Sequence, residues 1–182
     1  MVFNLTVISI SGTPCTGKTE ISKLLSKKLG YKLIQINELA EKLKAFIGYD
    51  KKRQCKILDM KKLEKEIKKI KENVIIEGHT SHLFPVDIII VLRCNPETLK
   101  KRLERRYPSN HLKVQENLEA EILGVITSES VMKNKKVYEI DTSEKNIEEN
   151  VNDILKILKG KTDDFKVGKI DWLEKYYDLI KL

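Results

Sequence analysis

The stretch GTPCTGKT, residues 12–19, follows the apolar run LTVISIS and constrains the fold of this chain more than any other feature. It matches the phosphate-binding template G-x-x-x-x-G-K-[ST] at every fixed position. Gly12 and Gly17 let the backbone turn and approach phosphate oxygens without a Cβ in the way. The loop amides then point inward beside the positive end of a helix. We expect Lys18 to reach the β- and γ-phosphates of a nucleotide and the Thr19 hydroxyl to bind Mg²⁺.

Short apolar runs alternate with amphipathic patterns along the rest of the chain. Strands are expected at residues 5–10, 31–36, 74–77, 87–92 and 137–140. Helices are expected over 19–29, from a cap at Asn37 to Gly48, after caps at Asp59 and Asn95, around 118–126, over 147–158 and in the C-terminal DWLEKYYDLIKL, which Asp171 would cap. This alternation is typical of an α/β fold with a parallel sheet. At 182 residues, a single domain over 1–182 is expected.

The charge and the cysteine content of the chain indicate its binding partners and its cellular compartment. The chain has 35 Lys+Arg against 27 Asp+Glu, a formal charge of +8, which favours anionic partners such as nucleotides and RNA. Many lysines alternate with glutamates, however, as on an ordinary solvated helix face. The three cysteines are widely spaced and suit a reducing compartment. The longest apolar run, VDIIIVL, is much shorter than the roughly 20 residues of a membrane span, so we expect a cytoplasmic protein without membrane contact.

An acid and a histidine follow the apolar run at residues 74–77, in the segment NVIIEGHTSHLFP. Glu77 would end a strand beside the phosphate loop, where such enzymes hold the water shell of Mg²⁺, although an ordinary salt bridge is the alternative. His79 could orient a water or the phosphoryl acceptor, or be a hydrogen-bonded loop histidine. His79, His82 and His111 lack the ligand spacing of a zinc site.

The segment LKKRLERRYPSNHLKVQENLEAEI places Arg102 and Arg106 one helical turn apart, with Arg105 beside them. Mobile arginines that close over the γ-phosphate would supply the charge neutralisation that phosphoryl transfer needs. The turn YPSNH between two helices suits a lid. The alternative is a basic helix face paired with Glu104.

Together the motifs resemble one known family. GTPCTGKT, INELA, IGYD, ILD, EGHTSHLFP, DIIIVLRC, RLERRY and VQENLEAEI occur here in the order found in the adenylate kinase isoenzyme 6 family, over about residues 5–158. That family comprises archaeal and eukaryotic adenylate-kinase-like NTPases linked to maturation of the small ribosomal subunit. The resemblance implies a nucleoside monophosphate (NMP) kinase fold with a five-stranded parallel sheet of order 2-3-1-4-5, flanked by helices. It also implies an NMP-binding region near 36–58 and a lid near 105–115, with residues 161–182 as a helical extension outside the resemblance.

The resemblance also implies the site residues. The ATP contacts would be Gly12, Cys15, Gly17, Lys18, Thr19, Glu20 and the lid arginine Arg106, while Glu77 and His79 would occupy the acid-x-His motif of the family. Two departures stand out. Glu77 replaces the more usual Asp, which bears on the reach to Mg²⁺, and Tyr107-Pro108 stands where an Arg-Gly-Tyr turn is common.

Three functions share this motif set. The first is an ATP:NMP phosphotransferase that uses Mg²⁺, ATP and AMP or a related NMP, with Lys18, His79 and Arg106 as catalytic residues and ATP hydrolysis as a side reaction. The second is an ATPase switch that binds and releases a small-subunit ribosomal protein or pre-ribosomal RNA, in which His79 places the attacking water. A small-metabolite kinase of the shikimate type is third, because no acidic substrate-binding cluster follows the second strand.

Overall fold

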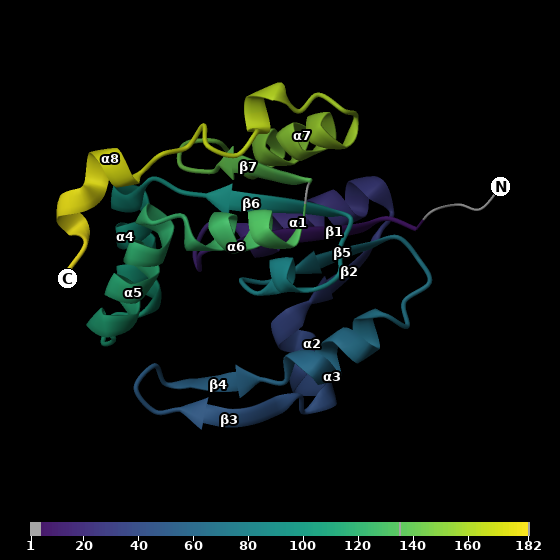
Figure 1. Cartoon of the computed structure of the whole chain (residues 1–182), viewed down its shortest axis with the longest axis horizontal. Helices are drawn as coiled ribbons and strands as arrows, with labels where there is room; N and C mark the ends of the chain where they lie inside the picture. Colours follow the sequence, from purple (N-terminus) through teal and green to yellow (C-terminus); the bar gives the residue numbers. More distant parts are fainter. Residues whose placement is uncertain (1–4, 135, 182) are drawn as a thin grey trace.

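A computed structural model describes residues 5–134 and 136–181 of the chain. Its central sheet has five parallel strands: β1 (Val7–Gly12), β2 (Lys32–Gln35), β5 (Val74–Glu77), β6 (Ile88–Arg93) and β7 (Val137–Asp141). They lie in the order β2-β5-β1-β6-β7 (Figure 1). Counted among themselves along the chain, these strands follow the order 2-3-1-4-5. The α/β P-loop kinase fold expected from the sequence is therefore confirmed.

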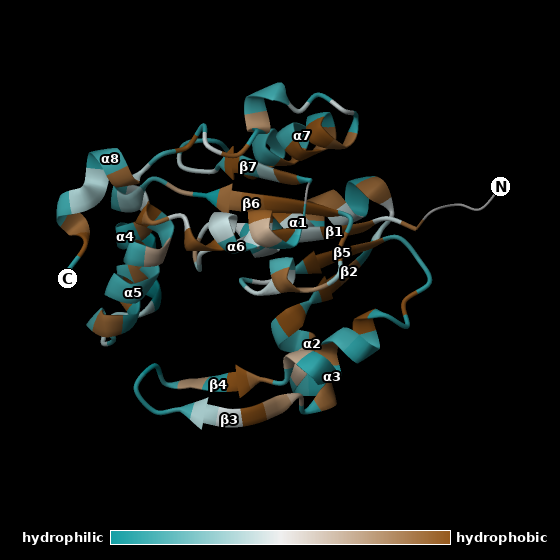
Figure 2. Cartoon of the chain, viewed as in Figure 1, coloured by the Kyte–Doolittle hydropathy of each residue, from teal (hydrophilic) through white to brown (hydrophobic). Residues whose placement is uncertain are grey.

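Helices cover both faces of the sheet. On one face, α1 (Lys18–Leu29) and α7 (Ile147–Leu158) form the largest hydrophobic cluster with the sheet. Ile8 and Ile10 of β1 are fully buried in this cluster, and Figure 2 shows the hydrophobic colouring of the central strands. The other face carries α6 (Val125–Lys133) and the 3₁₀ turn η1 (Ser81–Leu83). Side chains of a strand alternate between faces, so Ser9 and Ser11 point toward η1.

The region from residue 36 to 67 differs from the sequence expectation. It contains α2 (Ile36–Leu43), α3 (Met60–Ile67) and an antiparallel hairpin, β3 (Phe46–Asp50) paired with β4 (Cys55–Leu58). The predicted helix from Asn37 to Gly48 is therefore wrong at both ends. Gln35 precedes the first helical residue, and Lys44 ends α2 in a left-handed conformation, with φ of 50°. The chain then reverses, so that Phe46 lies opposite Leu58.

Two helices that pack against each other follow β6 in the chain. These are α4 (Pro96–Arg106) and α5 (His111–Ile122), joined by the turn at 107–110. The Asn95 side chain accepts a hydrogen bond from the Glu97 amide at 2.9 Å, which confirms the predicted cap. Asn110 caps α5 in the same way, accepting from the Lys113 amide at 2.9 Å.

Residues 172–180 of the C-terminal segment pack against α5, whereas the earlier part of the segment contacts β7 (Figure 1). It contains the 3₁₀ turn η2 (Asp163–Phe165), the short helix α8 (Leu173–Tyr176) and the 3₁₀ turn η3 (Tyr177–Leu179). Asp171 accepts from the Leu173 amide at 2.9 Å, as predicted, but the single amphipathic helix expected here is wrong. The backbone of Tyr176 leaves the helical region, with φ of −125°, where its ring is buried against Leu118 and Ile122. No helix among the described residues has the length and apolar character to cross a bilayer.

Candidate nucleotide-binding site

The loop between β1 and α1 adopts a conformation that depends on its glycines. Gly12 has φ of 141°, and a Cβ at this position would lie 2.4 Å from the backbone oxygen of Leu92. Gly17 has φ of 92° and directly precedes α1. Cys15 also adopts a positive φ, 72°, which is uncommon for a residue with a side chain. The loop therefore curls back over the start of α1.

This curl leaves a row of backbone donors without partners. Within the described chain, the N–H groups of residues 15, 17, 18, 19 and 20 donate to no protein acceptor, whereas the Thr16 amide is bonded to the Thr13 oxygen. They lie at the positive end of a 12-residue helix. Unpaired amides in this arrangement form an anion-binding site that suits phosphate groups.

Lys18 lies along the inside of the loop. Its Nζ donates to the backbone oxygens of Gly12 and Thr13, each at 2.8 Å. Only 8% of the residue is exposed, and this burial lowers the pKa of its ammonium group to about 8, an effect that the nearby Glu77 carboxylate opposes. Thr19 is half-buried in the first turn of α1. The Glu20 carboxylate pairs with Lys23 at 3.1 Å on the exposed surface. Glu20 therefore contributes its backbone amide to the anion-binding site, and its side chain points elsewhere.

Glu77 lies beside the loop strand at the carboxyl edge of the sheet. It is paired in register with Ile10 of β1, is 7% exposed and accepts a hydrogen bond from Gln35 Nε2 at 3.0 Å. Among the described residues, no cluster of three or more His, Cys, Asp and Glu is arranged to hold a metal ion. The Thr19 hydroxyl and the Glu77 carboxylate nevertheless fit Mg²⁺, which takes one or two protein oxygens and completes its shell with water and phosphate.

His79 and His82 follow Glu77 but have different surroundings. The His79 side chain is exposed. Partial burial of the imidazole, and then repulsion from the Lys18 charge, lower its pKa to about 4, so the ring is neutral at pH 7. His82 is 1% exposed; its Nδ1 lies 2.9 Å from Ser11 Oγ and its Nε2 lies 2.8 Å from Glu129. His82 therefore fixes the loop that presents His79, whereas His111 begins α5 elsewhere.

The arginines approach the loop from α4. Arg102 donates from its guanidinium to the Cys15 oxygen and to the Ser143 oxygen, each at 3.4 Å. Arg106 is exposed, and its charge, together with that of Lys18, acts on the Cys15 thiol. Burial still raises the pKa of that thiol, because it outweighs both charges. Lys18, Cys15 and Arg106 therefore come together around one loop, while Arg105 is exposed at the end of α4.

Sequence reasoning missed two groups near this loop. Lys113 of α5 places its Nζ 4.7 Å from the centre of the Tyr107 ring, and Arg106 lies 5.7 Å from the same ring. Both cations thus lie against the ring of Tyr107. The second group is a set of buried charged residues between α5 and the sheet, which includes Glu121 and Arg93. Residues of both groups lie in motifs quoted above, but the sequence does not show which of their side chains meet.

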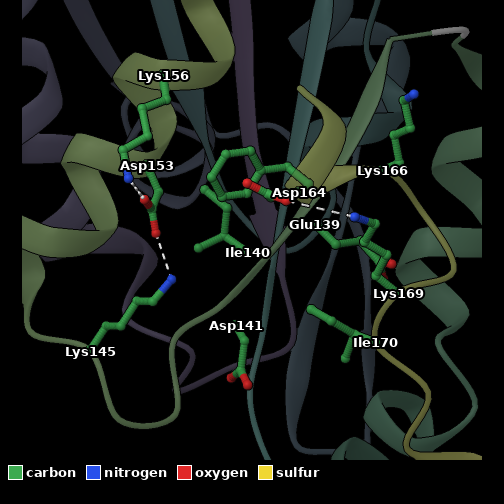
Figure 3. Close-up of a pocket in the computed structure, with 11 residues that line it drawn as sticks. Glu139, Ile140, Asp141, Lys145, Asp153, Lys156, Asp164, Lys166, Lys169 and Ile170 are labelled. Carbon is green, nitrogen blue, oxygen red and sulfur yellow. Dashed lines mark hydrogen bonds and ion pairs between the residues drawn. The ribbon is translucent and has the colours of Figure 1, made fainter. Parts of the chain in front are cut away.

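A cavity of about 370 Å³ lies elsewhere, beside β7, α7 and η2 (Figure 3). Its lining side chains pair largely with one another. Asp153 binds Lys145 at 2.6 Å and Lys156 at 2.7 Å, and Asp164 lies 3.8 Å from Lys169. The charged side chains of the cavity therefore neutralise one another. None of the residues expected to bind nucleotide lines this cavity.

Comparisons with known proteins agree with the geometry. The family described as AAA domain matches residues 8–124. A protein of Methanocaldococcus jannaschii described as "Putative adenylate kinase" is 46% identical over 179 residues, which cover 96% of this chain and 97% of that protein. A protein of Methanococcus maripaludis with the same description is 43% identical over 183 residues, covering 96% of this chain and 99% of that protein.

Among solved structures, a shikimate kinase from Acinetobacter baumannii in complex with shikimate superposes with a TM-score of 0.64 at 17% identity, covering 87% of this chain and 95% of that one. A deoxyadenosine kinase from M. mycoides gives a TM-score of 0.54 at 19% identity, covering 85% of this chain and all of that one. These two likenesses establish the fold alone. The full-length relatives go further, and the chain belongs to the adenylate kinase-like family of archaeal P-loop proteins.

Proposed function

We propose that the chain transfers the γ-phosphoryl group of ATP to AMP or a related NMP. The observation that carries this proposal is the row of unpaired amides at the head of α1, beside the Lys18 ammonium and within reach of two α4 arginines. These groups suit a triphosphate. The full-length similarity to proteins described as adenylate kinases supports an NMP as the acceptor.

The chemistry requires positioning more than proton removal. An NMP phosphate has a second pKa near 6, so the attacking oxygen is already ionised at neutral pH and no general base is needed. Lys18 and Arg106 would neutralise charge that develops on the transferred group, and the loop amides would hold the remaining phosphates. Thr19 and the water shell beside Glu77 would hold Mg²⁺, which supplies charge neutralisation when bound. We place the acceptor near residues 36–58, where α2 and the β3–β4 hairpin lie, and the lid at 105–115.

The test is ADP formation from ATP plus AMP, compared with ATP alone, over a panel of NMPs. Lys18→Ala should lower turnover at least a hundredfold, because it removes a transition-state cation in a water-poor site. Lys27→Ala, on the exposed side of the same helix, is the matched control and should leave the rate unchanged. Equal ADP production with and without AMP would contradict the proposal.

A second candidate is an ATPase switch that acts in small-subunit maturation. It is supported by His79, whose neutral imidazole is exposed two residues after Glu77, and by the resemblance to the adenylate kinase isoenzyme 6 family. In this role the imidazole would accept a proton from the attacking water, and a ribosomal protein or rRNA in the cytoplasm would be the partner. His79→Ala should then lower ATP hydrolysis about a hundredfold and leave the AMP-dependent rate nearly unchanged. An unchanged rate of hydrolysis would remove the support for this candidate.

A further inference from the structure

The phosphate loop is tied to α5 by a carboxylate of the VQENLEAEI segment, to which the sequence motifs assign no role. Glu121 lies in the last turn of α5 and is 2% exposed. Its Oε2 accepts a hydrogen bond from the Thr13 hydroxyl at 2.6 Å, and its Oε1 accepts from the Cys94 amide at 3.1 Å. Thr13 is the second residue of the phosphate-loop motif and is 2% exposed. This contact joins residues 108 positions apart in the chain.

Thr13 in turn holds the inside of the loop. Its backbone oxygen accepts from Lys18 Nζ at 2.8 Å and from the Thr16 hydroxyl at 2.9 Å. A rotation of the Thr13 peptide would therefore displace the ammonium group of Lys18 and the turn that exposes the loop amides. The hydrogen bond to Glu121 opposes that rotation, because a buried carboxylate is a strong acceptor held in place by its other partners.

The carboxylate is fixed from behind by an arginine. Arg93, at the end of β6, donates from Nε to Glu121 Oε1 at 2.7 Å and from a terminal nitrogen to the Glu121 backbone oxygen at 2.9 Å. Its other terminal nitrogen binds Glu139 of β7, and all three residues are at most 3% exposed. Two carboxylates thus share one guanidinium, and the buried Arg93 side chain holds the Glu121 carboxylate in place.

The same contact has a consequence for the lid. The helix α5 begins at His111, next to the lid turn, and ends at Ile122, about 16 Å away at 1.5 Å per residue. Glu121 therefore fixes the far end of the lid helix directly on the phosphate loop. Movement of the lid turn is expected to pivot about this end.

We propose that Glu121 is a positioning residue for nucleotide binding, which holds the phosphate loop in its binding conformation through Thr13 and anchors the lid helix to it. This inference rests on nucleotide binding by the loop, as in the proposed function. In this inference the Thr13–Glu121 contact supports nucleotide binding. Glu139, which also binds Arg93, contributes only to the stability of the fold.

The first experiment measures the affinity for MgATP by calorimetry in the full chain. Thr13→Val, which keeps the side-chain shape but removes the hydroxyl, should weaken binding about tenfold, the usual effect of losing a hydrogen bond to a charged group. Thr13→Ser keeps the hydroxyl and should bind within about twofold of the parent. Equal affinity of the Val and Ser variants would overturn the inference.

The second experiment separates positioning from stability. Glu121→Gln and Glu139→Gln each remove one carboxylate from Arg93 and should lower the melting temperature by similar amounts, but only Glu121→Gln should weaken MgATP binding. Adding Thr13→Val to Glu121→Gln should weaken binding by no more than about twofold further, because the two residues act through one contact. Additive losses, or an equal loss of affinity in Glu139→Gln, would overturn the inference. If Glu121→Gln does not fold, the comparison of MgATP affinity between Thr13→Val and Thr13→Ser tests the inference by itself.

These outcomes are distinguishable from failure of the proposed function. A parent chain that binds MgATP but makes no ADP from AMP would refute phosphoryl transfer and leave the role of Glu121 intact. If the parent chain transfers phosphate normally and Thr13→Val binds MgATP with the same affinity as the parent, the role of Glu121 is refuted and phosphoryl transfer is not.

Discussion

A single buried histidine illustrates how the site depends on residues to which the sequence motifs assign no role. His82 bridges Ser11 and Glu129 at 2.9 and 2.8 Å and lies under the loop that presents His79. We expect His82→Leu to lower the free energy of unfolding by about 2–3 kcal/mol, because two hydrogen bonds are lost in a buried position. Urea denaturation measures this. His111→Leu, an exposed histidine, is the control and should change stability by less than about 0.5 kcal/mol. Equal stability of His82→Leu and the parent would show that the bridge contributes nothing.

The residues that were predictable are those defined by local spacing. Gly12, Gly17 and Lys18 occupy fixed positions in an eight-residue motif, and the structure places them around one loop. Thr13 and Glu121 have no such signature, because they are 108 positions apart and only the folded chain brings them together. The roles assigned to Thr19, Glu77, His79 and Arg106 remain predictions, although the structure gathers Lys18, Cys15 and Arg106 at the loop.

At the scale of an element, the C-terminal segment offers a clean comparison between two adjacent tyrosines. Tyr176 is 6% exposed, packs against Leu118 and Ile122, and its hydroxyl accepts a hydrogen bond from Asn95 Nδ2 at 2.8 Å. Tyr177 is 60% exposed. Tyr176→Ala should cost about 3 kcal/mol, since a buried ring is lost, and Tyr176→Phe about 1 kcal/mol, since only the hydrogen bond is lost. Tyr177→Ala is the control and should cost less than about 0.5 kcal/mol. Thermal unfolding measures the series, and equal effects of the two alanine substitutions would contradict the packing described.

Elements with periodic apolar patterns and clear caps were predictable, and the hairpin was not. Phe46 continues the helical spacing of Leu39 and Leu43, so periodicity alone favours a longer helix. The turn between β3 and β4 contains Lys, Lys, Arg and Gln, with no Gly, Asn or Pro, and Gln54 adopts a positive φ of 50°. The usual signals of a hairpin are therefore absent from this turn. Pairing of Phe46 with Leu58, a tertiary effect, decides the structure.

At the scale of the whole molecule, the order of the sheet was predicted from the resemblance to the adenylate kinase isoenzyme 6 family, whereas the spacing of the elements predicted only a parallel sheet. The contact between the β3–β4 hairpin and α5 could not be predicted from the sequence. Arg53, near the hairpin tip, binds Asp50 of its own hairpin at 3.1 Å and Glu116 of α5 at 3.0 Å. These exposed pairs contribute little stability. They do place the hairpin, which belongs to the region expected to bind NMP, in contact with the helix that is fixed to the phosphate loop by Glu121 (Figure 1).

The same architecture predicts how the chain responds to its nucleotide. The loop joins β1, at the centre of the sheet, to α1 in the main core, so binding there should stabilise the whole chain. A non-hydrolysable ATP analogue with Mg²⁺, at a hundred times its dissociation constant, should add about 2.7 kcal/mol, which corresponds to a rise in melting temperature of about 5–10 °C. Differential scanning calorimetry measures this rise. Lys18→Ala should abolish most of it, whereas Lys27→Ala, on the exposed side of α1, should retain it. A rise that persists in Lys18→Ala would mean that the nucleotide binds away from this loop, because no other described element offers a row of unpaired amides with a buried ammonium beside it.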